Sequence, residues 1–164
     1  MKNIDIRRSI RNYLDKEVEQ EKIEQILRAA MQAPSAGNQR PWEFAVVRNK
    51  ELLKKLSEMG PYSKMVAKAP VAIVLIGKER DLVFEDLWTQ DMGACTQNLL
   101  LEIVEQGMGG VWLGVAPLVE RMQYVKEVLN LKEGKPFAVV PFGYTENENK
   151  YIDRYEENRV MYLD

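Results

Sequence analysis

Apolar residues recur at helical spacing in four stretches of the chain. Between residues 21 and 33 they return every three to four positions and Pro34 ends the run, which predicts an amphipathic helix. Residues 51–59 and 118–129 predict shorter helices. Residues 84–106 contain no proline and carry a broad apolar surface, so they predict a long central helix.

Short apolar runs rich in β-branched residues lie between these helical stretches. They predict strands over residues 43–47, 71–76, 111–115 and 137–142. A glycine-rich turn separates the long helix from the third of these strands. The alternation predicts an α+β fold with a central sheet of about four strands flanked by helices.

Residues 145–164 are polar and aromatic without a strong period. We expect an arm that leaves the core and lies over another surface. The chain has 164 residues, of which 46% are hydrophobic, and this length and composition suit one compact domain. The sequence therefore predicts a single domain over residues 1–164 with a C-terminal arm.

Charge and hydropathy argue against two classes of partner. The net charge of −2 offers no basic face for nucleic acid, and charged residues of both signs are interspersed. The N-terminus has no apolar signal core, and the longest apolar run, residues 71–76, is too short to cross a bilayer. We therefore expect a cytoplasmic protein that binds neither nucleic acid nor membrane.

The chain has no histidine and one cysteine, Cys95. These counts exclude a Ser-His-Asp triad, a Cys-His pair, an intrachain disulfide and a Cys/His zinc site, and we expect no metal. The serines stand in no G-x-S-x-G elbow, and the sequence has no G-x-x-x-x-G-K-[ST] phosphate loop. If the protein is an enzyme, we expect a cofactor to supply the reactivity.

Basic residues cluster near the N-terminus in R-R-S-x-R, formed by Arg7, Arg8, Ser9 and Arg11. Guanidinium groups and a hydroxyl together hold an anion through charge-assisted hydrogen bonds, and phosphate is the natural candidate. The alternative is a solvated basic turn, since arginines are common on protein surfaces.

A stiff loop joins the first predicted helix to the first predicted strand. Its sequence, A-P-S-A-G-N-Q-R-P-W-E-F over residues 33–44, combines small residues, two prolines and polar amides. Such a loop can press its backbone against a planar ligand. The alternative is a capped connection between the two elements, and for Trp42 we favour packing in the core.

These two segments resemble the nitroreductase family, in which an N-terminal R-x-S-x-[RK] and a P-S-x-x-N-x-Q-P-W loop both contact FMN. D-M-G-A-C-T-Q-N-L-L-L is similar to the family's central helix, G-M-G-G-V-W-L-G to its flavin-facing strand, and P-F-G-Y with the later Arg154 to its closing segment. The resemblance covers nearly the whole chain in order. It implies a nitroreductase-like fold, with a mainly antiparallel sheet flanked by helices and a long central helix at the interface of a homodimer.

The resemblance assigns roles to the basic residues. Arg7 and Arg154 match positions that hold the FMN phosphate, and Arg8 lies beside the first of them in the motif. Ser9 matches a position that contacts the phosphate or the ribityl chain. Arg11 matches the basic position near flavin N1 and O2, where a permanent cation favours reduction.

The resemblance also places the stiff loop against the cofactor. Ser35 and Asn38 match loop residues that reach the flavin of the other subunit, and Pro34 and Ala36 belong to the same contact segment. Arg40 stands where the family usually has Gln. Its contact with cofactor is therefore open, and it faces cofactor, substrate or solvent.

Leu113 and Gly114 match the backbone that faces flavin N5 and O4. The implied activity is an FMN-dependent, ping-pong transfer of hydride from NADH or NADPH to small electron-poor acceptors such as nitroaromatics or quinones. The protein then needs no acid, base or nucleophile of its own. The alternatives are a related flavin enzyme with a different acceptor, a non-catalytic FMN-binding or sensing protein, and an α+β interaction domain without cofactor. The acceptor and the choice of NADH or NADPH are left open.

Overall fold

A computed structural model describes residues 2–147 and 150–163. Within these residues one sheet contains five strands in the order β1-β2-β5-β3, and β4 pairs with the same edge of β5 as β3 does. Every pair of strands is antiparallel. The strands are β1 (Trp42–Val47), β2 (Val71–Gly77), β3 (Gly109–Gly110), β4 (Leu113–Gly114) and β5 (Lys135–Gly143).

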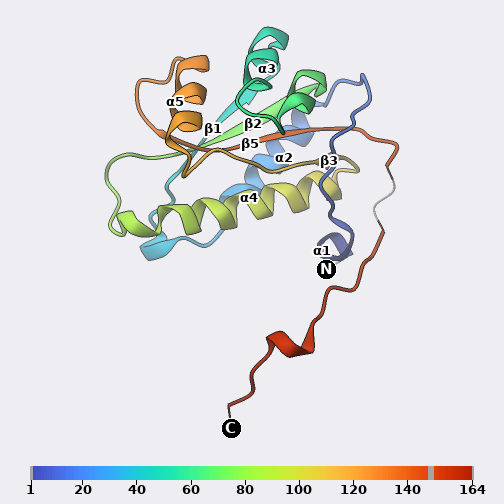
Figure 1. Cartoon of the computed structure of the whole chain (residues 1–164), viewed down its shortest axis with the longest axis vertical. Coiled ribbons are helices and arrows are strands. Elements are labelled where there is room, and N and C mark those ends of the chain that lie inside the picture. The colour runs from blue at the N-terminus through green and yellow to red at the C-terminus, as the bar shows by residue number, and fades with distance from the viewer. Residues whose placement is uncertain (1, 148–149, 164) are drawn as a thin grey trace.

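Helices cover both faces of this sheet, as Figure 1 shows. One core joins the sheet to α2 and α4, and a second core joins it to α3 and α5. The predicted α+β fold with a long central helix is therefore confirmed. The helices are α1 (Lys2–Ile6), α2 (Gln20–Met31), α3 (Lys50–Leu56), α4 (Trp88–Glu105) and α5 (Val119–Val128).

Strand β2 explains how one sheet supports two cores. All of its residues are buried. Val71, Ile73 and Leu75 lie in the core with α2 and α4, whereas Ala72, Val74 and Ile76 lie in the core with α3 and α5. Side chains of a strand alternate between its two faces, so an uninterrupted apolar run is what a strand between two helical layers requires.

Side-chain hydrogen bonds account for two helix boundaries that differ from the prediction. The long helix begins at Trp88 rather than at residue 84, because the Phe84 backbone is bonded to the Gln39 side chain and a 3₁₀ turn follows it. Helix α3 begins at Lys50, where the Asn49 side chain accepts hydrogen bonds from two free backbone N–H groups of the first turn.

The predicted strand over residues 111–115 is wrong in its extent, because only Leu113 and Gly114 of this range form a strand, β4, and the separate strand β3 precedes the range. Gly110 pairs with Phe142 and Leu113 with Val139, both on β5. The β5 residue between these pairs that stands opposite Val111 is Pro141, which has no N–H to donate. This division is why the sheet has five strands rather than about four.

The C-terminal arm leaves the sheet after β5 and extends away from it past α1 (Figure 1). All residues from 150 to 163 are exposed. Residues 148, 149 and 164 of the predicted arm lie outside the described residues, and the single-domain organisation stays a prediction. None of the described helices combines the length and the apolar character needed to cross a membrane.

Candidate functional site

The N-terminal basic segment adds an extended edge to the sheet. Ser9 forms a parallel bridge with Gly110, and the Ile10 N–H donates to the Gly110 carbonyl at 3.0 Å. Ile10 is buried against Gly109, where an added Cβ would lie 2.6 Å from Ile10 Cγ1. Because side chains alternate along an extended segment, Ser9 and Arg11 face outward on either side of Ile10.

The C-terminal arm passes beside this segment and brings Arg154 near Arg7. Arg8 links the two, since its Nη1 donates to the Arg7 carbonyl at 2.6 Å and its Nη2 to the Lys150 carbonyl at 2.7 Å. Its Nε is buried and has no hydrogen-bond partner among the described residues. Burial lowers the pKa of the Arg7 guanidinium, and the nearby charges of Arg8 and Arg154 lower it further. None of these three arginines forms an ion pair within the described ranges.

The stiff loop between α2 and β1 is held in an unusual backbone conformation. Gly37, Asn38 and Arg40 have φ values of 54°, 55° and 46°. Such values are uncommon for residues other than glycine. The Arg40 N–H donates to Ser35 Oγ at 3.0 Å, which closes the loop on itself. The Asn38 and Arg40 side chains are exposed.

A buried carboxylate fixes this loop to α4, and the sequence analysis did not identify it. Asp91 is 5% exposed and accepts hydrogen bonds from the Ala36 N–H at 2.9 Å and from Gln39 Nε2 at 2.7 Å. The Gln39 side chain also bonds both backbone polar groups of Phe84. The Phe84 ring in turn covers Gly37, where an added Cβ would lie 2.6 Å from it.

A cleft of about 250 Å³ lies beside the outer edge of the sheet. Three predicted site residues line it, namely Arg11, Leu113 and Gly114. An added Cβ at Gly114 would meet no atom within 4 Å, so this backbone is open to a flat ligand. The remaining lining residues were not predicted, and they are Met59, Gly60, Tyr62, Ser63, Trp112 and Arg121.

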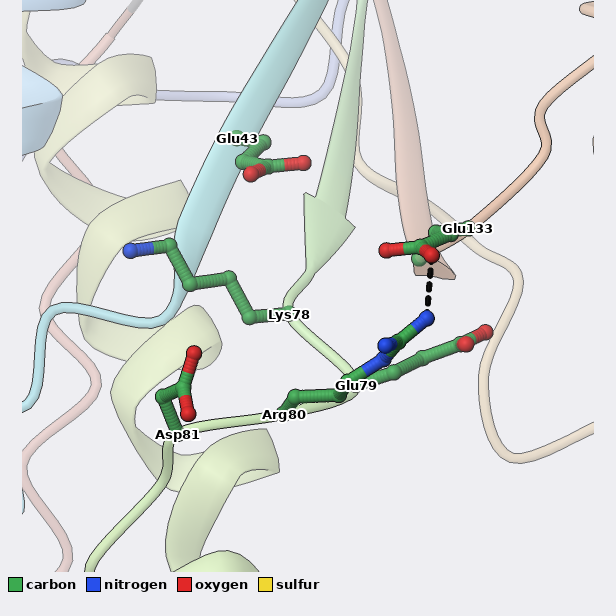
Figure 2. Close-up of a pocket in the computed structure, with 7 residues that line it drawn as sticks. Glu43, Lys78, Glu79, Arg80, Asp81 and Glu133 are labelled. Carbon is green, nitrogen blue, oxygen red and sulfur yellow. Dashed lines mark hydrogen bonds and ion pairs between the residues drawn. The ribbon is translucent and has the colours of Figure 1, made fainter.

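A second pocket, of about 300 Å³, lies where β5 begins and β2 ends (Figure 2). Its charges are paired in part, because Arg80 bonds Glu133 and Lys126 donates to Glu79 at 2.9 Å, while Glu43, Lys78 and Asp81 form no ion pair among the described residues. No predicted site residue lines it. Within the part of the chain that the structure describes, no cluster of His, Cys, Asp or Glu could hold a metal ion.

The structure thus divides the predicted residues into three groups. The first group lies where the N-terminal segment meets the arm and contains Arg7, Arg8, Ser9 and Arg154. The second group lines the cleft and contains Arg11, Leu113 and Gly114. The loop carrying Pro34, Ser35, Ala36, Asn38 and Arg40 lies instead at the N-terminal end of α4.

Comparison with known protein families identifies the family of this chain. The pattern of the Nitroreductase family matches residues 4–60 and 57–144. The chain belongs to the nitroreductase family. The family resemblance predicted from the motifs is therefore confirmed. A nitroreductase relative from Archaeoglobus fulgidus, named "Putative NADH dehydrogenase/NAD(P)H nitroreductase", is 44% identical over 165 residues, which cover 98% of this chain and 95% of that protein.

Solved structures of the nitroreductase fold agree with the sheet and helices described above. A "Putative NADH Oxidase" from Clostridium acetobutylicum is 49% identical with a TM-score of 0.94, and the match covers 97% of each chain. An "FMN-dependent Nitroreductase" from Clostridium difficile is 31% identical with a TM-score of 0.89, over 99% of this chain and 98% of that one.

Proposed function

We propose that this nitroreductase binds FMN and transfers hydride from NADH or NADPH, in a ping-pong cycle, to small electron-poor acceptors such as nitroaromatics or quinones. Relatives named as an NAD(P)H nitroreductase and as an FMN-dependent nitroreductase support an FMN-dependent oxidoreductase. The residue assignments come from the resemblance, and the geometry of this chain supports them.

The observation that carries the proposal is the group of arginines where the N-terminal segment meets the arm. Arg7, Arg8 and Arg154 lie close enough for their charges to oppose one another, and no carboxylate of the described residues pairs with them. Like charges held together without a partner favour an anion between them. The unsatisfied Arg8 Nε adds one more donor. This donor set fits a phosphate group, and Ser9 adds an exposed hydroxyl beside it.

The cleft fits the flat part of the cofactor. FMN, when bound, supplies hydride transfer at its N5. Leu113 and Gly114 offer an open backbone edge, and Arg11 offers a guanidinium cation beside it. The one thiol, Cys95, is buried, and burial raises its pKa to about 12, so it is no candidate nucleophile. The chain then binds and orients, and the cofactor provides the reactivity.

We further propose a homodimer whose sites combine residues of two chains. The Asp91 carboxylate holds the loop at one end of α4, and Asn3 bonds Glu105 at the other end, next to the arginine segment. From Asp91 to Glu105 a helix rises about 21 Å. The exposed loop amide of Asn38 is therefore well placed to serve the site of a second copy rather than the phosphate end of its own.

The arm supports the same homodimer. Seven of its described residues are large, apolar and exposed, and they are Tyr151, Ile152, Tyr155, Val160, Met161, Tyr162 and Leu163. An apolar surface of this extent is typical of a segment that packs on another protein. Its proposed partner is a second copy of this chain, with α4 at the interface.

Cofactor titration tests the proposal. We expect purified protein to be yellow after addition of FMN, with about one FMN per chain, and to bind riboflavin more weakly because riboflavin lacks the phosphate. Equal affinity for the two flavins would contradict the assignment of the arginines, and a colourless protein would contradict the function.

Mixed dimers test the shared site. A chain with Arg7→Ala combined with a chain carrying Asn38→Ala should retain one intact FMN site per dimer, because each intact site draws its arginine and its loop from different chains. A chain with both substitutions, paired with wild type, is the control and should retain no fully intact site. A monomer that holds FMN would contradict the homodimer.

A further inference from the structure

The cleft beside Gly114 continues outward into a second hollow. This outer hollow has a volume of about 430 Å³, and it shares Met59, Gly60 and Arg121 with the cleft. Arg121 therefore stands at the junction, between the backbone edge proposed to face the flavin and the space from which another small molecule would approach.

One hydrogen bond, through Nη1, holds the Arg121 guanidinium in this position. Its Nη1 donates to the Gly114 carbonyl at 2.7 Å. Its Nη2 lies against Gly60, where an added Cβ would be 2.9 Å away and would displace the end of this side chain. Nη2 and Nε have no hydrogen-bond partner among the described residues, and no described carboxylate pairs with this guanidinium.

The lining of the two hollows defines the kind of ligand that would fit. The inner cleft contains two arginines, Arg11 and Arg121, and no carboxylate. The outer hollow presents mainly apolar side chains, among them Leu118 and Val119, which are 51% and 77% exposed, together with one carboxylate, Glu120. Positive charge beside an apolar wall suits a molecule with a flat apolar body and one anionic group.

We propose that Arg121 is a specificity-determining residue that pairs with the anionic group of the molecule exchanging hydride at this site. This inference rests on the proposed FMN-dependent function. The shared chemistry is a carboxylate or phosphate oxygen, which the planar guanidinium binds through two parallel N–H groups. Two sources can supply it, an acidic acceptor or the diphosphate of the nicotinamide donor.

Ligand binding without turnover tests the pairing. The FMN-loaded protein is titrated with benzoate and with benzamide, and the shift of the flavin absorption spectrum gives each Kd. For Arg121→Met we expect the benzoate Kd to rise about tenfold or more and the benzamide Kd to stay within twofold. Lys126→Met, which removes the same charge from the same helix beside the pocket of Figure 2, is the control and should change neither.

Kinetics distinguish the two sources of the anion. The acceptor arm compares p-nitrobenzoate with p-nitrobenzamide, and the donor arm compares NADH with N-benzyl-dihydronicotinamide, which lacks the diphosphate. A higher KM confined to the charged member of either pair supports the pairing and names its source. Equal changes for charged and neutral members, or no change in either arm, would overturn it.

Two measurements keep the test decisive. If Arg121→Met does not fold, the wild-type protein is titrated at rising ionic strength, where the benzoate Kd should rise and the benzamide Kd should not. A salt-independent benzoate Kd would overturn the pairing. Wild-type protein that holds no FMN contradicts the proposed function, and this inference falls with it. FMN-loaded protein that treats benzoate and benzamide alike contradicts the role of Arg121 alone.

Discussion

Two hollows of similar size differ in the charged side chains that line them. The cleft beside Gly114 measures about 250 Å³ and the pocket of Figure 2 about 300 Å³. The pocket contains four carboxylates, and two of them are bonded to basic side chains. The cleft contains two arginines and no carboxylate. The cleft is therefore lined by positive charge alone, whereas the pocket is lined by charges of both signs, some of them paired.

The difference also involves the backbone. In the cleft the arginines contact carbonyl groups of the chain, and Arg121 bonds the Gly114 carbonyl at 2.7 Å while its other donors have no hydrogen-bond partner among the described residues. In the pocket, Arg80 and Lys126 contact carboxylates instead. A guanidinium oriented by a backbone carbonyl keeps its full charge for a ligand, whereas one paired with a carboxylate does not. Volume alone would not separate the two hollows.

The largest expected effect is on FMN affinity. Arg7→Ala should raise the FMN Kd by about tenfold to a hundredfold, which corresponds to the roughly 1.5–3 kcal/mol of a charged hydrogen bond, and should leave riboflavin affinity unchanged. Arg80→Ala in the pocket of Figure 2 is the matched control and should alter neither. Fluorescence titration measures both. Equal losses in the two variants would remove the distinction between the hollows.

Next in size is the buried carboxylate that holds the loop. Asp91→Ala leaves the Ala36 N–H and the Gln39 amide without their acceptor, so the free energy of unfolding should fall by about 1–3 kcal/mol and FMN affinity should fall with it. Glu43→Ala, an exposed carboxylate of the other pocket, should change stability by no more than about 0.5 kcal/mol. Urea unfolding compares them, and similar losses would show that Asp91 has no special role.

A smaller effect distinguishes the arginine that tunes the flavin potential from the arginine that anchors the phosphate. Arg11 lines the cleft and is exposed, so water screens its charge. Arg11→Ala should lower the two-electron potential of bound FMN by about 20 mV, or roughly 1 kcal/mol, and slow reduction by NADH or NADPH. Potentiometric titration of FMN-saturated protein measures the shift. A potential that moves in Arg7→Ala and stays unchanged in Arg11→Ala would reverse the two assignments.

The smallest effect lies in the pocket of Figure 2 and depends on pH. The hydrogen bond from Lys126 lowers the pKa of Glu79. A lowered pKa in the folded state adds stability above the unfolded pKa, and this stability is lost as the pH falls through the folded value. Lys126→Met should raise the pKa of Glu79 and remove a few tenths of a kcal/mol near neutral pH. An NMR titration that shows an unchanged Glu79 pKa would contradict this pairing.

Sequence periodicity was sufficient for the elements that bury whole faces. Strand β2 and helices α2 and α4 place apolar residues at the spacing that their cores require, so the pattern indicated them. Helix α1 has only five residues, too few for a period to show. The division between β3 and β4 depends on Pro141 of the neighbouring strand, and a local pattern carries no information on that neighbour.

The site was predictable where a short motif carried it and not elsewhere. R-x-S-x-R indicated Arg7, Ser9 and Arg11 because an extended segment presents alternate residues together. Gln39 and Asp91 are 52 positions apart, and only folding brings them within hydrogen-bond distance. Arg121 stands on a helix with other charged residues, and only the contact with Gly114 distinguishes it.

The reaction of bound FMN with nicotinamide tests the central claim most directly. FMN-loaded wild-type protein is mixed anaerobically with NADH, and separately with NADPH, in a stopped-flow spectrometer. We expect the flavin absorbance to be lost with at least one of them and to return when a nitroaromatic or a quinone is added afterwards. Flavin that stays oxidised with both donors would contradict the proposed oxidoreductase and indicate a protein that binds FMN without using it.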